Sequence, residues 1–456
     1  MIDPSHFERR TVSFYTLGCK LNFSETSTIA RQLEKDGFIK VDFREGADIY
    51  VINTCSVTGI AEKKCRQVIH KALRINPNAF IVVTGCFAQL KPKEIASIKG
   101  VDLILGSNEK LDMSFYSGSF VKKNKAEIHA GNIAKDKRFM PSWSLGDRTR
   151  TFLKVQDGCD YFCTYCTIPL ARGRSRNATI KDTVEQARKA GKAGAKEIIL
   201  TGVNIGDFGK STDESFFDLL VALEKVSEVE RFRISSIEPN LLSSEIIQLV
   251  ASSPRFMPHF HLPLQSGSNK VLKLMKRKYD TELFLQKIES IRKNIPNAFI
   301  GVDVITGIKG ETENDFETTY NFIQNLDISQ LHVFTYSERP NTQALKIQHT
   351  VLPEEKKRRS ALLHELSAHK LRKFYKRFEN TKAKVLFEEH LSNGKMHGFT
   401  ENYLRVECPF DPALINQIIE VKLMTISPQS GNMTIHLPEY SLHDNEFQNI
   451  SEKFDF

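Results

Sequence analysis

The stretch "IYVINTCSVTGIAEKKCRQVIHKAL" (49–73) decides the fold of the first part of the chain. Five of its first six residues are β-branched or aromatic, which is typical of a buried strand, and this run ends in Cys55. The following residues place Cys65, Val68 and Ala72 on one face of a helix, so Cys65 is expected in the core. A strand followed by an amphipathic helix forms a βα unit, and such units predict a parallel α/β sheet.

The same pattern occurs three times in the first 110 residues. "SFYTLGC" (13–19) and "FIVVTGC" (80–86) are also β-rich runs that end in a cysteine and lead into a helical stretch. The C-terminal ends of parallel strands open on one edge of a sheet, where ligands usually bind. We therefore expect three cysteines to meet in space although 31 to 36 positions separate them: Cys19, Cys55 and Cys86. Chance placement of a small residue at strand ends is the alternative, and three occurrences out of three argue against it.

Composition and charge limit the class of protein. A length of 456 residues exceeds one ordinary core, so two or three domains are expected. The start, "MIDPSHFERR", lacks the apolar stretch of a secretory signal, and no run reaches membrane-spanning length. Eight cysteines are too few for a disulfide scaffold, so we expect a cytoplasmic protein with reduced thiols and no membrane association. The net charge of +9 favours a polyanionic partner.

The rest of the chain divides into three further regions. Residues 111–147 carry many Lys and Ser with little periodicity and are predicted to form a linker. From 148 to about 345, six strand-plus-loop units alternate with helical stretches, which predicts a partial (β/α) barrel. A long basic helix (352–380) precedes short alternating strands, which predict a small β-barrel. The expected domains are 1–147, 148–380 and 381–440, followed by an acidic tail, 441–456.

A second group of cysteines lies in "DGCDYFCTYCTIPLARGRSR" (157–176), where Cys159, Cys163 and Cys166 fall within eight residues. Structural zinc normally takes four protein ligands, and no fourth ligand follows at finger-like spacing. A [4Fe-4S] cube has four irons, so three thiolates leave one iron open. Radical chemistry on S-adenosylmethionine uses such an open iron.

This spacing, with Tyr165 just before the last cysteine, resembles the radical S-adenosylmethionine superfamily. "TLGCKLN", "INTCSVT" and "TGCFAQ" resemble the three cysteine motifs of the methylthiotransferase family, which carry an auxiliary [4Fe-4S] cluster. The resemblance covers nearly the whole chain, because the terminal barrel resembles the RNA-binding TRAM domain of that family. It implies two [4Fe-4S] clusters with S-adenosylmethionine as cofactor, one cluster on each set of cysteines: Cys19, Cys55 and Cys86, and Cys159, Cys163 and Cys166.

The resemblance also implies a reaction. One S-adenosylmethionine methylates a sulfide on the auxiliary cluster, a second yields a 5′-deoxyadenosyl radical that activates a C–H bond, and a methylthio group is transferred. "TLGCKLN", "LTGVNIG", "RISSIEP" and "HLPLQSGS" resemble the branch that acts on N6-threonylcarbamoyladenosine at position 37 of tRNA. Ile308-Lys309 departs from the usual Phe-Pro of the family. The implied partners are the tRNA anticodon stem-loop and a reductant such as flavodoxin or ferredoxin, and we expect a monomer.

Further residues are candidates for the cofactor and RNA. The following side chains are expected near S-adenosylmethionine, with ordinary loop capping as the alternative for the last four: Tyr165, Asn204, Glu238, Gln265 and Ser266. Asp303 either touches the cofactor or satisfies backbone donors, and His261 is expected to hold its loop. The arginines of "ARGRSR" are predicted to grip phosphates: Arg172, Arg174 and Arg176. Aromatic residues of the last barrel are candidates for base stacking, with at least one of them in the core: Phe387, Phe399 and Tyr403.

Four alternatives to this function remain open from sequence. The isopentenyladenosine branch uses the same apparatus on another tRNA nucleoside, and a related branch methylthiolates an aspartate of a ribosomal protein. A non-catalytic RNA-binding protein with structural clusters would tolerate loss of Cys159. An electron carrier would normally close each iron with a fourth ligand, which neither set of three cysteines supplies.

Overall fold

The computed structural model describes residues 10–56, 59–146 and 149–437. The chain forms two compact units, 1–373 and 374–456. The expected mixed α/β class is confirmed, with a parallel N-terminal sheet, a central barrel-like domain and a closed C-terminal β-barrel. The acidic tail, 441–456, lies outside the described residues.

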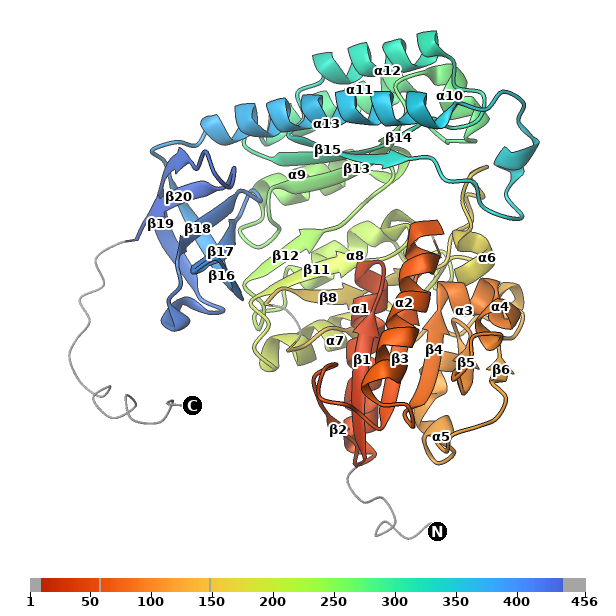
Figure 1. Ribbon diagram of the computed structural model, residues 1–456. Helices are drawn as coiled ribbons and strands as arrows, with labels where there is room; N and C mark the ends of the chain where they lie inside the picture. Colours follow the sequence, from red (N-terminus) through yellow and green to blue (C-terminus); the bar gives the residue numbers. More distant parts are fainter. Residues whose placement is uncertain (1–9, 57–58, 147–148, 438–456) are drawn as a thin grey trace, which may run out of the picture. The chain divides into compact units, whose positions relative to one another are not determined.

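The N-terminal sheet has six parallel strands in the order β2-β1-β3-β4-β5-β6 (Figure 1). The strands are β1 (Thr11–Thr16), β2 (Ile39–Lys40), β3 (Ile49–Thr54), β4 (Phe80–Gly85), β5 (Leu103–Leu105) and β6 (Glu127–His129). The main helices are α1 (Lys20–Lys35), α2 (Gly59–Ile75), α3 (Cys86–Leu90) and α4 (Pro92–Ala96). Every residue of β3 and β4 is buried, which explains why these strands are continuous apolar runs without alternation. The three predicted strand-cysteine-helix units are confirmed.

The segment 111–146 contains more secondary structure than the linker predicted for 111–147. It contains α5 (Met113–Ser117), β6 and β7 (Ser142–Trp143). Strand β6 pairs with β5, and β7 pairs antiparallel with β8 of the central domain. The prediction failed because all three residues of β6 are exposed, so backbone pairing alone defines this edge strand and leaves no hydrophobic pattern.

The central domain contains the six predicted parallel strands. They are β8 (Thr151–Lys154), β11 (Glu197–Thr201), β12 (Arg231–Ile234), β13 (His259–Gln265), β14 (Phe299–Thr306) and β15 (Gln330–Thr335). Parallel pairing joins β8, β11 and β12 on one side and β13, β14 and β15 on the other. A parallel bridge between Ser236 and His261 connects the two groups just beyond β12. The result is an open barrel, as the alternating pattern predicted.

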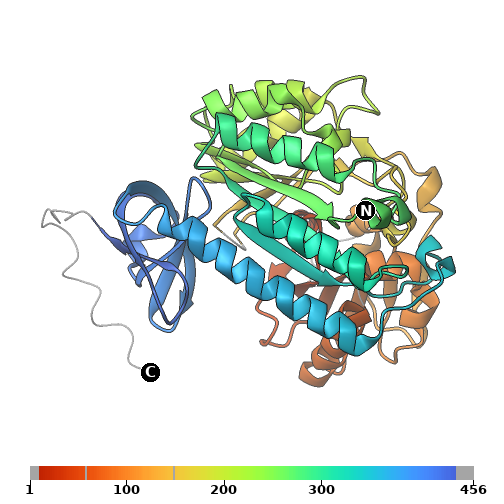
Figure 2. The same ribbon diagram turned by 90° about the horizontal axis from the view of Figure 1, so that it is seen from above.

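Helices cover the outer face of this barrel (Figures 1 and 2). They are α7 (Ile180–Lys192), α8 (Phe216–Leu223), α9 (Ser244–Ser252), α10 (Asn269–Leu274), α11 (Thr281–Asn294), α12 (Glu313–Asn325) and α13 (Pro353–Lys376). Phe232, Phe260 and Val302 from the strands and Leu363 from α13 share one continuous core. The long basic helix is confirmed as α13. Its basic run "KKRR" (356–359) has the composition of an ordinary solvated face, but Arg359 in it is buried, with Nη1 2.8 Å from Glu311 Oε2.

Ile308, part of the departure from the family pattern, is fully buried with Val271, Met275 and Tyr336. Lys309 lies 3.5 Å from Glu338. Ile308 therefore packs against α10 and the segment after β15, Lys309 pairs with that same segment, and Gly307 N–H donates to Glu311 Oε2 (2.6 Å).

The C-terminal unit is a closed barrel in the order β16-β17-β18-β20-β19. Its strands are β16 (Lys382–Ser392), β17 (Lys395–Thr400), β18 (Arg405–Pro409), β19 (Ile418–Ile426) and β20 (Met433–His436). Phe387 is fully buried in it, while Phe399 and Tyr403 are partly exposed and stack with ring centroids 4.8 Å apart. Cys408, which has no cysteine neighbour in the sequence, is buried in β18.

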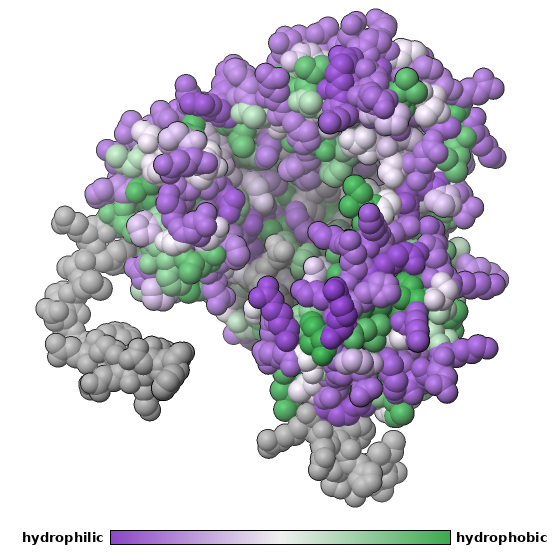
Figure 3. All heavy atoms as spheres, viewed as in Figure 1, coloured by the Kyte–Doolittle hydropathy of each residue, from purple (hydrophilic) through white to green (hydrophobic). Residues whose placement is uncertain are grey.

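Hydrophilic residues dominate the face of the molecule in Figure 3, with hydrophobic residues in small patches. Across the described residues, no helix is both long and apolar enough to cross a membrane.

Candidate active site

The first cysteine site lies at the C-terminal ends of β1, β3 and β4, which are neighbours in the sheet. Cys19 directly precedes α1, Cys55 follows β3, and Cys86 begins α3. Burial raises the pKa of the Cys86 thiol, Arg172 opposes this shift, and the nearby Cys19 adds to it. The structure therefore brings together the strand ends that carry the three cysteines. We call this set the distributed site.

Two glycines make room for the turns of the distributed site. A Cβ atom on Gly18 would lie 2.8 Å from Cys55 Cβ and 3.1 Å from its Sγ. A Cβ on Gly85 would lie 2.5 Å from both Asn53 Oδ1 and the carbonyl oxygen of Thr54. Both glycines also have positive φ angles, which L side chains rarely adopt. Three thiols on a cradle that admits no further side chain fit an iron–sulfur cluster.

Asn22 holds two of these turns together. Its Nδ2 donates to the carbonyl oxygens of Leu17 (2.7 Å) and Thr54 (3.1 Å). Leu17 lies two positions before Cys19, and Thr54 lies directly before Cys55. Asn53 Nδ2 in turn donates to the main-chain oxygen of Asn22 (3.1 Å). The sequence reasoning missed this residue, although it ends the quoted motif "TLGCKLN".

The second cysteine site is a single loop between β9 (Gln156–Asp157) and α6 (Ile168–Arg172). Strand β9 pairs with β10 (Arg176–Asn177), and Cys159 N–H donates to the carbonyl oxygen of Gly173 (3.0 Å), which closes the loop at its base. We call this set, Cys159, Cys163 and Cys166, the local site.

Each sulfur of the local site accepts a hydrogen bond. Tyr161 N–H donates to Cys159 Sγ and Ile168 N–H to Cys166 Sγ, both at 3.4 Å. Arg277 Nη1 donates to Cys163 Sγ at 3.1 Å. Donors aimed at all three sulfurs stabilise thiolates, so this donor set fits an iron–sulfur cluster. For the free thiols of Cys159 and Cys166, burial raises the pKa to about 12.

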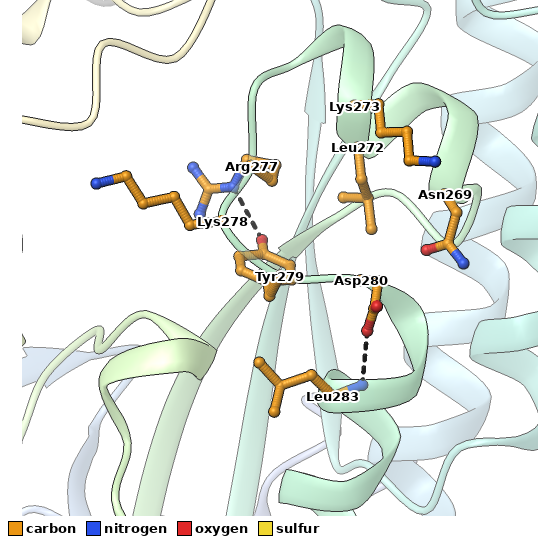
Figure 4. A pocket seen from close by; sticks show the side chains of 8 residues that line it. All are labelled: Asn269, Leu272, Lys273, Arg277, Lys278, Tyr279, Asp280 and Leu283. Carbon is orange, nitrogen blue, oxygen red and sulfur yellow. Dashed lines mark hydrogen bonds between the residues drawn. The ribbon is translucent and has the colours of Figure 1, made fainter.

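Arg277 joins the local site to the end of β12. Its guanidinium donates to Glu238 and to the hydroxyl of Tyr279 (3.0 Å, Figure 4). Burial raises the pKa of Glu238, and the ion pair with Arg277 opposes that shift. Tyr165 is partly buried, and its hydroxyl accepts a hydrogen bond from Arg277 Nη1 (3.5 Å). Arg277 was not predicted, although it lies in the basic run "MKRKYD" (275–280).

A pocket of about 360 Å³ opens beside Arg277, between α10 and α11 (Figure 4). Lys273 and Lys278 also line it. Lys278 Nζ lies 4.0 Å from the ring centroid of Tyr161, within the cysteine loop. The local site thus has a cationic pocket at its margin.

Two of the predicted cofactor contacts present buried acceptors. Among the described residues, Asn204 Oδ1 and Gln265 Oε1 have no hydrogen-bond partner. Gln265 has a φ of 68° at a bulge in β13, which is an uncommon conformation for this residue. Ser266 instead contacts α12, with its Oγ 3.0 Å from Thr319 Oγ1. Cofactor binding by Tyr165, Asn204, Glu238, Gln265 and Ser266 remains a prediction.

Adjacent strands carry a polar cluster. His261 Nε2 lies 2.7 Å from Asp303 Oδ1, and the rings of His261 and His332 are 4.9 Å apart. These residues come from β13, β14 and β15. Asp303 thus has a side-chain partner, and His261 is fixed by it.

The arginines of "ARGRSR" do not all face a ligand. Arg172 is buried against Glu25 and Asp157, and Arg176 Nη2 lies 3.2 Å from Asp157. Of the three, Arg174 is exposed, with 63% of its side chain accessible. The prediction that all three grip phosphates is therefore wrong for Arg172 and Arg176, because buried carboxylates occupy their guanidinium groups.

Within the described residues, no group of three or more His, Cys, Asp or Glu side chains is arranged to hold a metal ion. Iron–sulfur binding by the six cysteines therefore stays a prediction, supported by the donor sets described above. All eight cysteines lie in the described part of the chain and are free thiols.

Comparisons with known proteins decide the family. The uncharacterized protein family UPF0004 matches residues 11–106, and the radical SAM superfamily matches residues 153–323. The threonylcarbamoyladenosine tRNA methylthiotransferase MtaB of Bacillus subtilis is 39% identical over 91% of this chain and 94% of its own length. The chain belongs to the radical S-adenosylmethionine methylthiotransferase family. It is therefore an enzyme, a transferase of a superfamily that uses a [4Fe-4S] cluster and S-adenosylmethionine.

Other members and neighbours extend this picture. A tRNA-2-methylthio-N(6)-dimethylallyladenosine synthase of Clostridium botulinum is 32% identical over 90% of this methylthiotransferase and 93% of the relative. The radical S-adenosylmethionine methyltransferase TsrM of Kitasatospora setae, solved with cobalamin and a [4Fe-4S] cluster, aligns with a TM-score of 0.54. At 15% identity over 74% of this chain and 77% of TsrM, that likeness concerns the fold alone.

Proposed function

We propose that this enzyme installs a 2-methylthio group on N6-threonylcarbamoyladenosine at position 37 of tRNA, with two S-adenosylmethionine molecules as methyl donor and radical source. One observation carries the proposal: the chain holds two separate sets of three cysteines, and a [4Fe-4S] cube bound by either set would keep one iron without a protein ligand. A reaction that needs both a radical and a delivered sulfur requires two such sites.

The residues of the two sites have distinct tasks in this proposal. Cys159, Cys163 and Cys166 hold one [4Fe-4S] cluster, and Arg277 steadies it by its bond to Cys163 Sγ (3.1 Å). Cys19, Cys55 and Cys86 hold the other. When bound, the clusters and S-adenosylmethionine supply the radical and the methylthio sulfur. The buried acceptors Asn204 Oδ1 and Gln265 Oε1 are available to polar groups of the cofactor.

The tRNA partner is supported by charge and by aromatic surface. Arg174, Lys273 and Lys278 offer cations near the local site, which suit phosphates around an anticodon loop. In the C-terminal barrel, Phe399 and Tyr403 form a partly exposed stacked pair that suits unstacked bases. We further propose that the enzyme works as a cytoplasmic monomer with a reductant such as flavodoxin or ferredoxin.

The test is a nucleoside assay. Total tRNA from cells with and without the gene is digested, and its nucleosides are separated by mass spectrometry. The proposal expects loss of the 2-methylthio form of N6-threonylcarbamoyladenosine and accumulation of its unthiolated parent. Loss of methylthio from the isopentenyl derivative instead would assign the enzyme to the other tRNA branch. No change in any tRNA nucleoside, with the gene expressed, would reject tRNA as substrate and direct the search to ribosomal protein.

A further inference from the structure

A buried network of charged side chains lies between the two cysteine sites. It joins Glu25 of α1 and Lys110 of the N-terminal domain to side chains of the central domain: Lys154, Asp157, Arg172 and Arg176. Each of these six side chains is at most 6% exposed. Burying charge is costly unless partners are close, so the network holds only while both domains supply their members.

Arg172 bonds to residues beside both cysteine sites: Asn22 near the distributed site and Asp157 at the base of the local loop. It ends α6, the helix that follows the local site. Its Nη1 donates to Glu25 Oε1 and Asp157 Oδ1, both at 3.0 Å. Its Nη2 donates to Asn22 Oδ1 at 2.6 Å and to Glu25 Oε2 at 3.1 Å. The guanidinium therefore binds α1 with two nitrogens, in the planar fork geometry that lysine cannot reproduce.

Asn22 connects Arg172 to the distributed site by hydrogen bonds. The same amide whose oxygen accepts from Arg172 donates through its nitrogen to Leu17 O and Thr54 O, at the turns of Cys19 and Cys55. A single side chain thus connects the turns of two ligands of the distributed site to the helix that leaves the local site.

A second arginine makes a similar contact at another point. Arg339, in the loop after β15, bonds to Glu62 of α2 and donates to Ser56 Oγ (3.3 Å), next to Cys55. Lys91 Nζ also bonds to Glu62 (2.9 Å). Arg172 and Arg339 of the central domain therefore contact the N-terminal domain at two places close to its strand-end cysteines.

We propose that Arg172 is a positioning residue that fixes the distributed site relative to the local site, through Asn22 and Glu25, so that sulfur and radical meet on one substrate. The proposal rests on the proposed function only in requiring that both cysteine sets carry clusters. Misplacement of reacting groups by about 1 Å can lower a rate about 10²-fold, which gives such a residue its value.

The first measurement uses the protein without clusters. Amide hydrogen exchange is followed in R172M, R172K, wild type and a control, R188M, which removes an exposed arginine of α7. We expect exchange in R172M to rise together in 17–26 and 157–173, with R172K intermediate and R188M like wild type. Unchanged exchange in either segment of R172M would overturn the proposal. If R172M fails to fold, R172K carries the same test, because it keeps the charge and loses the fork.

The second measurement uses the reconstituted holoenzyme and a signal that a merely structural role would not move. In R172M we expect wild-type iron content but a weaker magnetic interaction between the two reduced clusters by electron paramagnetic resonance. We also expect 5′-deoxyadenosine formed per methylthio product to rise severalfold, with partial recovery in R172K. An interaction and a product ratio equal to wild type would reject the positioning role. Failure of the proposed function would be seen separately, as an unchanged tRNA nucleoside profile, and would leave the exchange result standing.

Discussion

The two cysteine sites obtain three thiols each in opposite ways. The local site takes them from eight consecutive residues, and two of its sulfurs accept hydrogen bonds from N–H groups of the same loop. The distributed site takes them from three strand ends, and its turns depend on Asn22, on two glycines without space for a side chain, and on charges from the next domain.

This difference teaches that the two sites should fail differently. A local loop forms once its own ends are closed, whereas ligands far apart in sequence require the whole sheet to be folded first. We therefore expect some substitutions to disrupt either site without affecting the other. Substitutions in the contacts between the domains should damage only the distributed site.

Removing one ligand from each site gives the largest expected effect. C163A should abolish both S-adenosylmethionine cleavage and methylthio transfer, because the open iron is lost. C86A should stop methylthio transfer but leave cleavage to 5′-deoxyadenosine in place. The iron content of each variant should fall from about eight to about four atoms per chain. Iron analysis and chromatography of 5′-deoxyadenosine check this, and cleavage by C163A at the wild-type rate would contradict it.

Removing a carboxylate from the buried network should weaken the distributed site through stability. E25Q leaves Arg172, Lys110 and Lys154 without their shared partner, which we expect to cost about 3–5 kcal/mol. Thermal unfolding of the cluster-free protein at pH 7 measures the loss. The control is E185Q, which removes an exposed carboxylate paired with Lys189 on α7 and should change stability by less than about 1 kcal/mol.

Glu25 also predicts that the stability of the fold depends on pH. Burial alone would raise the pKa of Glu25, but Arg172, Lys110 and Lys154 outweigh burial and hold it below its ordinary value of 4.5. Because the folded-state pKa is the lower one, the carboxylate stabilises the fold above about pH 4.5, and this contribution declines as the pH falls further. The nearby Asp157, whose pKa is also lowered, acts in the same direction. Stability of E25Q should therefore fall less steeply than that of wild type below pH 4.5, and equal slopes would refute this.

Adding a methyl group to a glycine tests each turn separately. A Cβ on Gly158 would lie 1.9 Å from the carbonyl oxygen of Arg174, at the base of the local loop. G158A should therefore impair S-adenosylmethionine cleavage, whereas G85A should impair only methylthio transfer. Positive φ alone costs about 1–3 kcal/mol, and G37A isolates that part, since Gly37 has φ +94° and nothing within 4 Å of its Cβ position. Equal loss of cleavage in G158A and G85A would contradict the separation.

The smallest effect is expected at a cysteine outside both sites. Cys65 is fully buried in the core of the N-terminal sheet, and burial raises the pKa of its thiol to about 12. C65A should keep its full iron content and lose about 1 kcal/mol of stability. Iron analysis beside thermal unfolding checks this, with C408A as a second packing cysteine, and a loss of iron in C65A would make it a ligand.

Much of the fold followed from local patterns. The three strand-cysteine-helix units, the six strands of the open barrel and the closed terminal barrel each appear as periodic runs in the sequence. The six cysteines could be proposed as ligands because spacing and strand-end position are properties of short segments. Strand β6 was missed because its exposed residues carry no such pattern.

Partnerships across long separations were not visible in the sequence. Arg172 was assigned to RNA because its neighbours are basic, yet its partner Glu25 lies 147 positions away. Arg277 reaches Cys163 over 114 positions, and Asn22 reaches Arg172 over 150. A basic run has the same appearance whether it faces a phosphate or a buried carboxylate, and only the fold decides between them.

The residues of the buried network are synthesised at different times, because they lie far apart in the chain. Domains of a chain generally fold as units, the N-terminal one first. Glu25 and Lys110 therefore leave the ribosome before Lys154, Asp157 and Arg172 exist to join them. The newly made N-terminal sheet has its three strand-end cysteines but not the side chain that connects Asn22 to the central domain. Consequently the contact between Arg172 and Asn22 forms only after all three cysteines of the distributed site have been made.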